Sequence, residues 1–145
     1  LSVTVRIIRN LAQIYENQLL CWNSTFTKSR SIKHLKYTME NKEYFARISE
    51  LFERVEEKLD EFEDEIDYDP SPDKLMVNIE KNGKKIVINT QRAIKEIWLA
   101  GNSKGWHFQF QPEKEIWFAN AEQQEFYKCL ANLLSDNLGQ EVSFK

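Results

Sequence analysis

Residues 74–89 have the sequence KLMVNIEKNGKKIVIN, and this stretch decides the fold class. Apolar residues occupy every second position from Leu75 to Ile79, which is the period of a strand with one buried face. The pair Asn82-Gly83 follows, and both residues tolerate the positive φ of a tight hairpin turn. A second strand is predicted from Lys85 to Asn89. The stretch therefore predicts two antiparallel strands joined by a short turn.

Three further strands and a helix are predicted on the C-terminal side of this hairpin. The inward residues of the strands are Ile97 and Leu99 in the first, Trp106, Phe108 and Phe110 in the second, and Ile116 and Phe118 in the third. Asn120 followed by Gln123 resembles a capping box. The apolar stripe of the helix that follows consists of Phe126, Leu130, Leu133 and Leu134.

A first helix is predicted on the N-terminal side, because apolar residues recur there at steps of three and four. Its stripe consists of Phe45, Ile48, Phe52, Val55, Leu59 and Phe62. Pro70 and Pro72 cannot continue a helix. Strands grouped between two helices indicate an α+β fold, in which both helices cover one face of an antiparallel sheet. We expect one domain over residues 39–145.

The end of the first helix is unusually acidic, since nine of the fourteen residues from Glu56 to Asp69 are carboxylates. Negative charge at a helix C-terminus costs about 0.3 to 1 kcal/mol per badly placed group, and Lys58 is the single basic residue in the stretch. We call these nine residues the acidic cluster: Glu56, Glu57, Asp60, Glu61, Glu63, Asp64, Glu65, Asp67 and Asp69.

Carboxylate oxygens suit hard cations such as ferric iron, calcium or magnesium, and ferrous iron less selectively. The acidic cluster lacks both histidine and the spacing of a calcium loop. It therefore predicts either weak metal binding at several positions or docking against a basic protein surface. The alternative is a solvated face that only keeps the domain soluble.

Trp98 lies between the inward residues Ile97 and Leu99, so alternation directs it to the face of the sheet that no predicted helix covers. One interpretation is an exposed binding anchor. The other is a ring shielded by neighbours such as Gln91 and His107. The pattern alone favours neither interpretation.

No catalytic constellation is found in the sequence. Cys21 and Cys129 suggest no disulfide framework, and Cys129 is interpreted as a packing residue of the second helix. His34 and His107 are too few for a zinc site with these cysteines, and His107 is expected on the surface beside Trp98.

The charge of the chain is unevenly distributed. Residues 1–38 hold six basic residues and one acid, whereas residues 39–145 hold 14 basic and 22 acidic residues. An acidic body argues against nucleic acid as a partner, and no apolar run approaches the roughly 20 residues that span a membrane. The basic segment 1–38 is typical of a mitochondrial-type transit peptide. The alternative is a non-native leader ahead of a natural start at Met39.

Three motifs together resemble the frataxin family. They are Ile88-Asn89-Thr90-Gln91, Lys95-Glu96-Ile97-Trp98-Leu99-Ala100 and Gly105-Trp106-His107-Phe108, and the resemblance extends from Tyr44 to Lys145 with Glu115-Ile116-Trp117 and the acidic first helix. The third motif is nearer to bacterial members. The family often has proline at the position of Ala93 and a basic residue at that of Thr90.

The resemblance implies two helices on one face of an antiparallel sheet, which agrees with the fold predicted above. It further implies weak binding of ferrous and ferric iron by the acidic cluster and a regulatory role in iron–sulfur cluster assembly. The implied partners are a cysteine desulfurase and its scaffold protein, contacted through the acidic cluster and through Asn89, Gln91 and Trp98. The alternative function is a ferroxidase or iron-storage protein.

We expect a monomer, with an iron-dependent oligomer as the alternative. Bacterial members begin near the first helix, so the basic extension favours the mitochondrial matrix or a related organelle. A bacterial cytoplasm is the alternative if residues 1–38 are not native.

Overall fold

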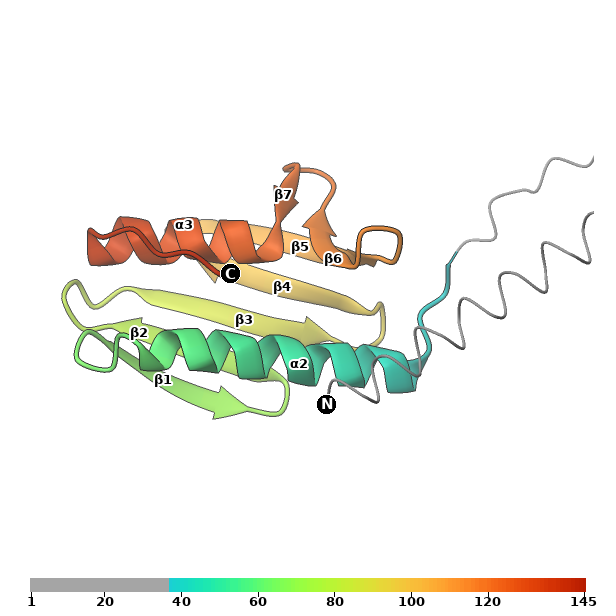
Figure 1. Ribbon diagram of the computed structural model, residues 1–145, viewed down its shortest axis with the longest axis horizontal. Helices are drawn as coiled ribbons and strands as arrows, with labels where there is room; N and C mark the ends of the chain where they lie inside the picture. The colour runs from blue at the N-terminus through green and yellow to red at the C-terminus, as the bar shows by residue number, and fades with distance from the viewer. Residues whose placement is uncertain (1–36) are drawn as a thin grey trace, which may run out of the picture. The chain divides into compact units, whose positions relative to one another are not determined.

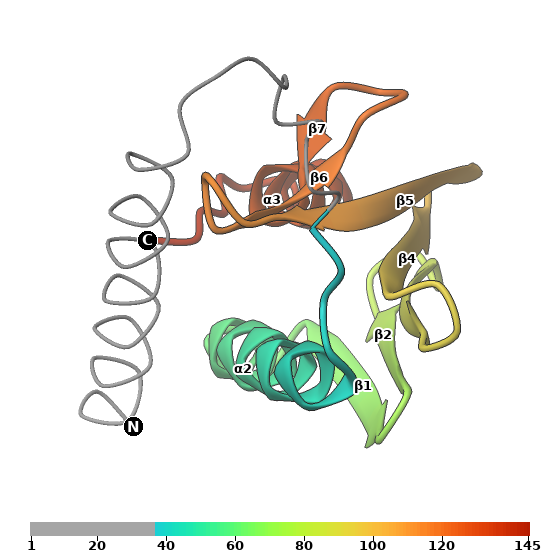
Figure 2. The same cartoon turned by 90° about the vertical axis from the view of Figure 1, so that its right-hand side faces the viewer.

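The computed structural model describes residues 37–145, and within this range two helices pack on one face of a seven-stranded antiparallel sheet (Figures 1 and 2). Helix α2 spans Asn41–Asp60 and α3 spans Phe126–Leu138. The strands are β1 (Ile66–Ser71), β2 (Lys74–Ile79), β3 (Lys85–Gln91), β4 (Glu96–Gly101), β5 (Lys104–Gln111), β6 (Ile116–Ala119) and β7 (Gln124–Glu125). Their order in the sheet is their order in the chain. The predicted fold class is confirmed.

The prediction for the basic segment 1–38 falls almost wholly outside the described residues, as do Cys21 and His34. The described residues form one compact unit, Tyr37–Lys145. The predicted domain boundary at residue 39 stays a prediction.

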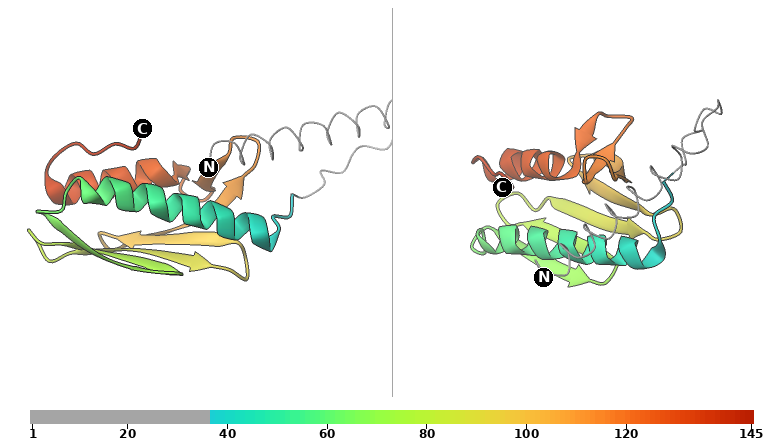
Figure 3. Two further views of the ribbon diagram at one scale, coloured as in Figure 1. Left: turned by 60° about the horizontal axis from the view of Figure 1, so that its bottom comes forward. Right: turned by 45° about the vertical axis from the view of Figure 1, so that its right-hand side comes forward.

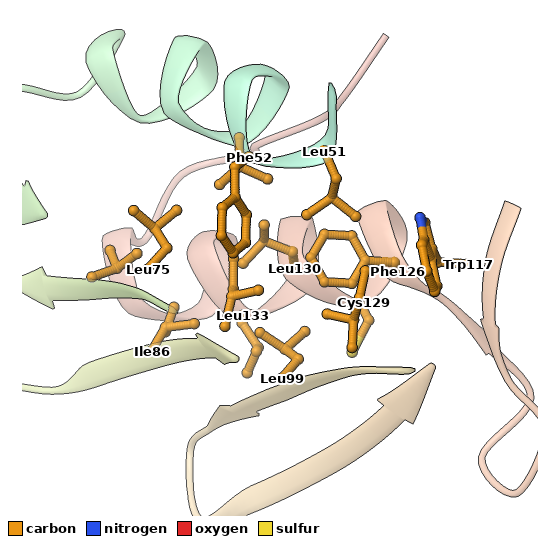
Figure 4. Close-up of a cluster of buried hydrophobic side chains, with 14 of the residues drawn as sticks. Leu51, Phe52, Leu75, Ile86, Leu99, Trp117, Phe126, Cys129, Leu130 and Leu133 are labelled. Atoms are coloured by element: carbon orange, nitrogen blue, oxygen red, sulfur yellow. The ribbon is translucent and has the colours of Figure 1, made fainter. Parts of the chain in front are cut away.

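The core lies between the helices and the sheet. Figure 3 shows α2 and α3 on the same face of the sheet, and Figure 4 shows buried side chains gathered between α2 and the strands, in front of α3. Leu130 of α3 and Leu99 of β4 are fully buried there. The rings of Phe108 and Phe126 meet edge to face with centroids 5.2 Å apart. Cys129 is a packing residue, as predicted: it is 3% exposed, and burial raises the pKa of its thiol to about 11.

Two strands, β1 and β7, were not predicted. β1 contains Pro70, which cannot donate a hydrogen bond, but within the described residues β1 lies at the edge of the sheet and pairs with β2 alone. Its inward residues Ile66 and Tyr68 lie opposite Ile79 and Val77 of β2. The alternation of Ile66 and Tyr68 with acids ends at Pro70, so the run is too short to mark a strand.

The prediction that Ile116 and Phe118 point inward is wrong. Trp117 and Ala119 are the buried residues of β6, with exposed fractions of 5% and 0%. Trp117 pairs with Phe110 of β5, and their ring centroids are 5.3 Å apart. Because β6 is apolar on both faces, the sequence does not fix its register, and a shift of one residue exchanges the faces.

The helix boundaries also differ from the prediction. α2 begins at Asn41, and Tyr44 rather than Phe45 is its first core residue: Tyr44 is 1% exposed and Phe45 43%. The hydroxyl of Tyr44 donates to the Glu96 carbonyl oxygen over 2.8 Å, which fixes this inward position. Phe62 lies beyond the helix end but still packs against the core.

The predicted capping box of the second helix is wrong as well. Asn120 and Gln123 precede β7, and the N-cap of α3 is Glu125. The Glu125 carboxylate accepts from the backbone N–H groups of Tyr127 and Lys128, each over 3.1 Å. A carboxylate at this position accepts hydrogen bonds from two backbone N–H groups of the first helical turn. Its negative charge also interacts favourably with the positive end of the helix dipole.

Candidate functional site

The acids of α2 point away from the sheet because its apolar residues are held against it. Val55 and Leu59 are fully buried, so Glu57 and Asp60 are exposed and Glu56 is half-buried. The helix ends at Asp60 without a glycine cap, and its last turn carries one basic residue, Lys58. The chain then continues through turns over residues 61–65 into β1.

Three members of the acidic cluster have a partner in the structure. The Tyr68 hydroxyl donates to Asp60 Oδ1 over 2.6 Å, Lys58 Nζ lies 3.0 Å from both carboxylate oxygens of Glu61, and Gln140 Nε2 donates to Glu65 Oε1 over 2.9 Å. The hydrogen bond to Asp60 is the main reason that the pKa of Tyr68 is raised to about 12. Within residues 37–145, the side chains of the other members form no hydrogen bond or ion pair: Glu56, Glu57, Glu63, Asp64, Asp67 and Asp69.

The strand register divides the acidic cluster between the two faces of the molecule. Since Ile66 of β1 faces the helices, Asp67 and Asp69 point to the opposite face. Their cross-strand neighbours there are Asn78 and Met76 of β2. Glu56, Glu57 and Asp60 lie in the helix layer instead. The cluster therefore spans two layers of the molecule, although it is one run in the sequence.

In the part of the chain that the structure describes, no three histidine, cysteine or acidic residues converge in a geometry that could hold a metal ion. The cluster offers separate oxygen ligands on α2, on the turns after it and on β1. Such an arrangement can attract cations electrostatically along α2. It provides no preformed coordination shell.

The second candidate surface is the face of the sheet that no described helix covers (Figure 2). A cross-strand row joins Asn89 of β3, Trp98 of β4 and His107 of β5. The rings of Trp98 and His107 are 4.1 Å apart between centroids, yet Trp98 remains 38% exposed. The outward position of Trp98 is confirmed. His107 covers part of the ring and does not shield it fully.

Polar residues of the neighbouring row restrain this aromatic pair. Gln91 and Gln109 both lie opposite Glu96, and Gln109 Nε2 donates to Glu96 Oε1 over 2.8 Å. The other oxygen of Glu96 is 3.7 Å from Nδ1 of His107. The surface formed by Asn89, Gln91, Glu96, Trp98 and His107 is called the Trp98 face below.

Thr90 does not belong to this face. It is 8% exposed, lies opposite the inward residue Ile97, and its hydroxyl bonds to Asp73. The residue at position 90 therefore contributes nothing to the charge of the Trp98 face.

Sequence reasoning missed Glu96 and Tyr68 as parts of these surfaces. Alternation from Trp98 would have placed Glu96 on the same face two residues earlier. Tyr68 could be placed beside Asp60 only once β1 was known to be a strand.

Among the described residues, no helix is both long and apolar enough to cross a membrane.

Comparison with known proteins agrees with this geometry. Residues 31–140 match the family model described as the Frataxin-like domain. Among solved structures, the chain is similar to frataxin from Psychromonas ingrahamii, studied as a model for stability modulation within the CyaY protein family. The two are 26% identical with a TM-score of 0.67, and the match covers 74% of this chain and 99% of that chain.

Proposed function

Because this chain belongs to the frataxin family, we propose that it is an iron-binding regulator of iron–sulfur cluster assembly. The family is generally linked to iron handling and to the assembly machinery for such clusters. In the proposed role, the acidic residues of α2 hold iron weakly or meet a basic surface of a cysteine desulfurase. The Trp98 face contacts the desulfurase and scaffold complex.

One observation carries the proposal: Trp98 stays 38% exposed between Asn89 and His107 on an uncovered sheet face, in a chain of this family. A large aromatic side chain held in place by neighbours loses little conformational entropy on binding, so it suits a binding anchor. The polar neighbours Asn89 and Gln91 can form directional hydrogen bonds around such an anchor.

The decisive experiment measures the rate of cluster assembly with reconstituted desulfurase and scaffold. Trp98→Ala should change the rate, whereas the matched variant Asn78→Ala should not. Asn78 lies on the same sheet face in a different cross-strand row, opposite Lys85. An unchanged rate with Trp98→Ala, in a protein that unfolds at the wild-type temperature, would remove the Trp98 face from the mechanism.

Iron binding is tested separately by titrating ferrous iron while recording amide chemical shifts from Glu56 to Asp69. The division of the acidic cluster provides matched variants. Glu56→Gln with Glu57→Gln removes charge from the helix layer, and Asp67→Asn with Asp69→Asn removes the same charge from the opposite face. The proposal expects the first pair to abolish the shifts on α2 and the second to leave them. Amide chemical shifts of the wild type that do not change when iron is added contradict iron binding.

The same variants test the alternative function, oxidation of ferrous iron and storage of the product on the carboxylates. A ferroxidase must consume oxygen faster than buffer alone, and neutralising Glu56, Glu57, Asp60 and Glu61 to amides should remove the excess. Oxygen consumption at the buffer rate argues against this alternative and leaves the regulatory proposal intact.

For the location, we propose the mitochondrial matrix or a related organelle. The proposal is supported by the composition of residues 1–38, with six basic residues and one acid. The N-terminus of the mature protein, determined from its native source, tests it. Removal of the basic segment from the synthesised chain supports import into an organelle. Synthesis that starts at Met39 supports a bacterial cytoplasm.

A further inference from the structure

A groove runs along α2 on the side of β1, and it combines apolar and acidic walls. It encloses about 680 Å³. At the N-terminal half of α2 its lining is mostly apolar, with Phe45 and the largely buried Ile48 and Phe52 on the helix and Pro72 from the β1–β2 turn on the other side. Ser49 and Arg92 are the polar residues of this half. Figures 1 and 2 show that α2 and β1 are neighbours.

The C-terminal half of the groove is acidic. Its lining residues there are Glu53, Glu56, Glu57 and Asp60. Their spacing of three, one and three residues places them on adjacent turns along one side of the helix. Glu56 and Glu57 form no hydrogen bond or ion pair within residues 37–145, so their charge is not compensated there.

Phe45 is the exposed apolar group of the groove. Phe45 is 43% exposed. A polar residue at this position would be solvated by water, and the core would lose nothing. The guanidinium carbon of Arg92 lies 5.2 Å from the ring centroid, and Arg92 is itself held by an ion pair with Asp73. The Tyr44 ring also meets Phe45 edge to face, with centroids 5.8 Å apart, so both neighbours hold the exposed ring at the groove.

We propose that this groove binds a basic, amphipathic segment of a partner protein. An apolar side chain of the segment packs between Phe45, Phe52 and Pro72, and basic side chains lie along Glu56, Glu57 and Asp60. Phe45 and Asp60 are fifteen positions apart on one helix, which corresponds to about 22 Å. The groove therefore fits about four turns of a helical segment.

The charge of the groove selects the class of partner. Four carboxylates line the groove against one basic residue, Arg92, which is paired with Asp73. The excess negative charge repels the phosphates of nucleic acids and of anionic membranes, so a protein segment is favoured. A helix that places apolar anchors in a groove and charges along its rim is a recurring form of peptide recognition. The inference rests on the proposed function where Glu56, Glu57 and Asp60 are shared with it. The apolar half with Phe45, Phe52 and Pro72 goes beyond it.

The test uses the full chain and a synthetic helical peptide of about fifteen residues, with two leucines one turn apart in its first half and four lysines in its second half. Binding is measured by fluorescence anisotropy, and the binding site is located by amide chemical shifts at Phe45 and Ser49.

Phe45→Ser should weaken binding about tenfold, because it removes an apolar contact that corresponds to roughly one decade of affinity. The matched variant Tyr37→Ser removes an aromatic ring that is also 43% exposed but lies outside the groove, and it should bind like the wild type.

Two changes to the peptide separate the two halves of the groove. Replacing both leucines by serine should weaken binding as much as Phe45→Ser, and replacing the lysines by glutamate should abolish it. Equal affinity of the wild type and Phe45→Ser would overturn the inference, since the acids alone would then account for binding. Unmoved amides at Phe45 and Ser49 would overturn it too. Self-association that Phe45→Ser abolishes, without peptide binding, would assign the groove to a second copy of the chain and so also overturn it.

The cluster-assembly assay keeps this result distinct from the proposed function. Trp98→Ala tests the proposed function and lies outside the groove, so it should leave peptide binding unchanged. If Trp98→Ala has no effect on assembly while Phe45→Ser still weakens the peptide, the proposed function fails and the groove stands. If the effects are reversed, the groove fails and the proposed function stands.

Discussion

Helices α2 and α3 pack on the same face of the sheet, but their ends are built differently. α3 begins with the carboxylate of Glu125 on two backbone donors and ends at Gly139, whose φ of 71° closes the helix through a bond to the Ser135 carbonyl oxygen. α2 has no side-chain cap at Glu40 and ends in acids rather than in a glycine. A side-chain cap at the first end and a glycine at the last end are thus present in α3 and absent from α2.

This difference shows that the chain tolerates unfavourable local energetics at the ends of α2. α3 also has a buried polar side chain, Asn137, that is hydrogen-bonded on both sides. Its oxygen accepts from Asn82 over 3.1 Å and its NH2 group donates to Asn102 over 3.2 Å, so these bonds join α3 to two hairpin turns. Its residues serve the fold. The outer side of α2 serves neither capping nor packing, and it lines the groove with Phe45 and the acids. Sites that break a local rule without compensation are often functional.

The largest expected effect tests whether α3 is the structural helix. Leu130→Ala should lower the free energy of unfolding by about 2 to 5 kcal/mol, because Leu130 is fully buried and its removal leaves a cavity. The exposed Phe45→Ala on α2 should cost less than about 1 kcal/mol. Urea denaturation monitored by tryptophan fluorescence measures both. Similar losses in the two variants would break the comparison.

A second, smaller effect concerns the helix caps. Glu125→Ala should destabilise the protein by about 1 kcal/mol, since two backbone N–H groups of α3 lose their acceptor. Glu40→Ala at the corresponding position of α2 should change stability little, because no side-chain hydrogen bond is lost. Chemical denaturation of both variants checks the contrast, and a loss at Glu40 that equals the loss at Glu125 would refute it.

A third effect has the opposite sign. Glu57→Gln should stabilise the protein by about 0.3 to 1 kcal/mol, because it removes charge near the negative end of the α2 dipole and among other acids. Asp136→Asn in the last turn of α3 is the control for the dipole alone. It removes an acid from a similar helix position outside the acidic cluster, so it should stabilise the protein less than Glu57→Gln does. Added salt should raise the melting temperature of the wild type more than that of Glu57→Gln. A melting temperature indifferent to ionic strength would contradict the assignment.

The fold was predictable from the sequence wherever one face of an element is polar. Alternation placed β2 to β5 correctly, and the position of Trp98 followed from Ile97 and Leu99. Alternation did not place β6, which is apolar on both faces, or β1, whose face of acids is present but whose alternating run of Ile66 and Tyr68 ends at Pro70. In both cases the register comes from pairing with a neighbouring strand, which local pattern does not contain.

The candidate surfaces were predictable only in part, because their members come from separate elements. The acids were recognised as a run, but the division between α2 and the opposite sheet face depends on the register of β1 with β2. The groove depends on Pro72 and Arg92, which approach α2 from two different turns. Nothing in the sequence near Phe45 indicates these neighbours.

The smallest expected effect concerns the single hydrogen bond that ties the acids of α2 to β1, between the Tyr68 hydroxyl and Asp60. This bond holds the phenol protonated, so the pKa of Tyr68 is raised to about 12 in the folded protein from about 10 in an unfolded chain. A raised folded pKa favours the folded state fully below pH 10, and this contribution is lost as the pH rises from about 10 through about 12. Phenolate absorbance of the wild type minus that of Tyr68→Phe should therefore have its midpoint near pH 12. Asp60→Asn should move the midpoint towards 10, since the negative acceptor is lost, and a midpoint that does not move would show that Asp60 is not what holds the proton.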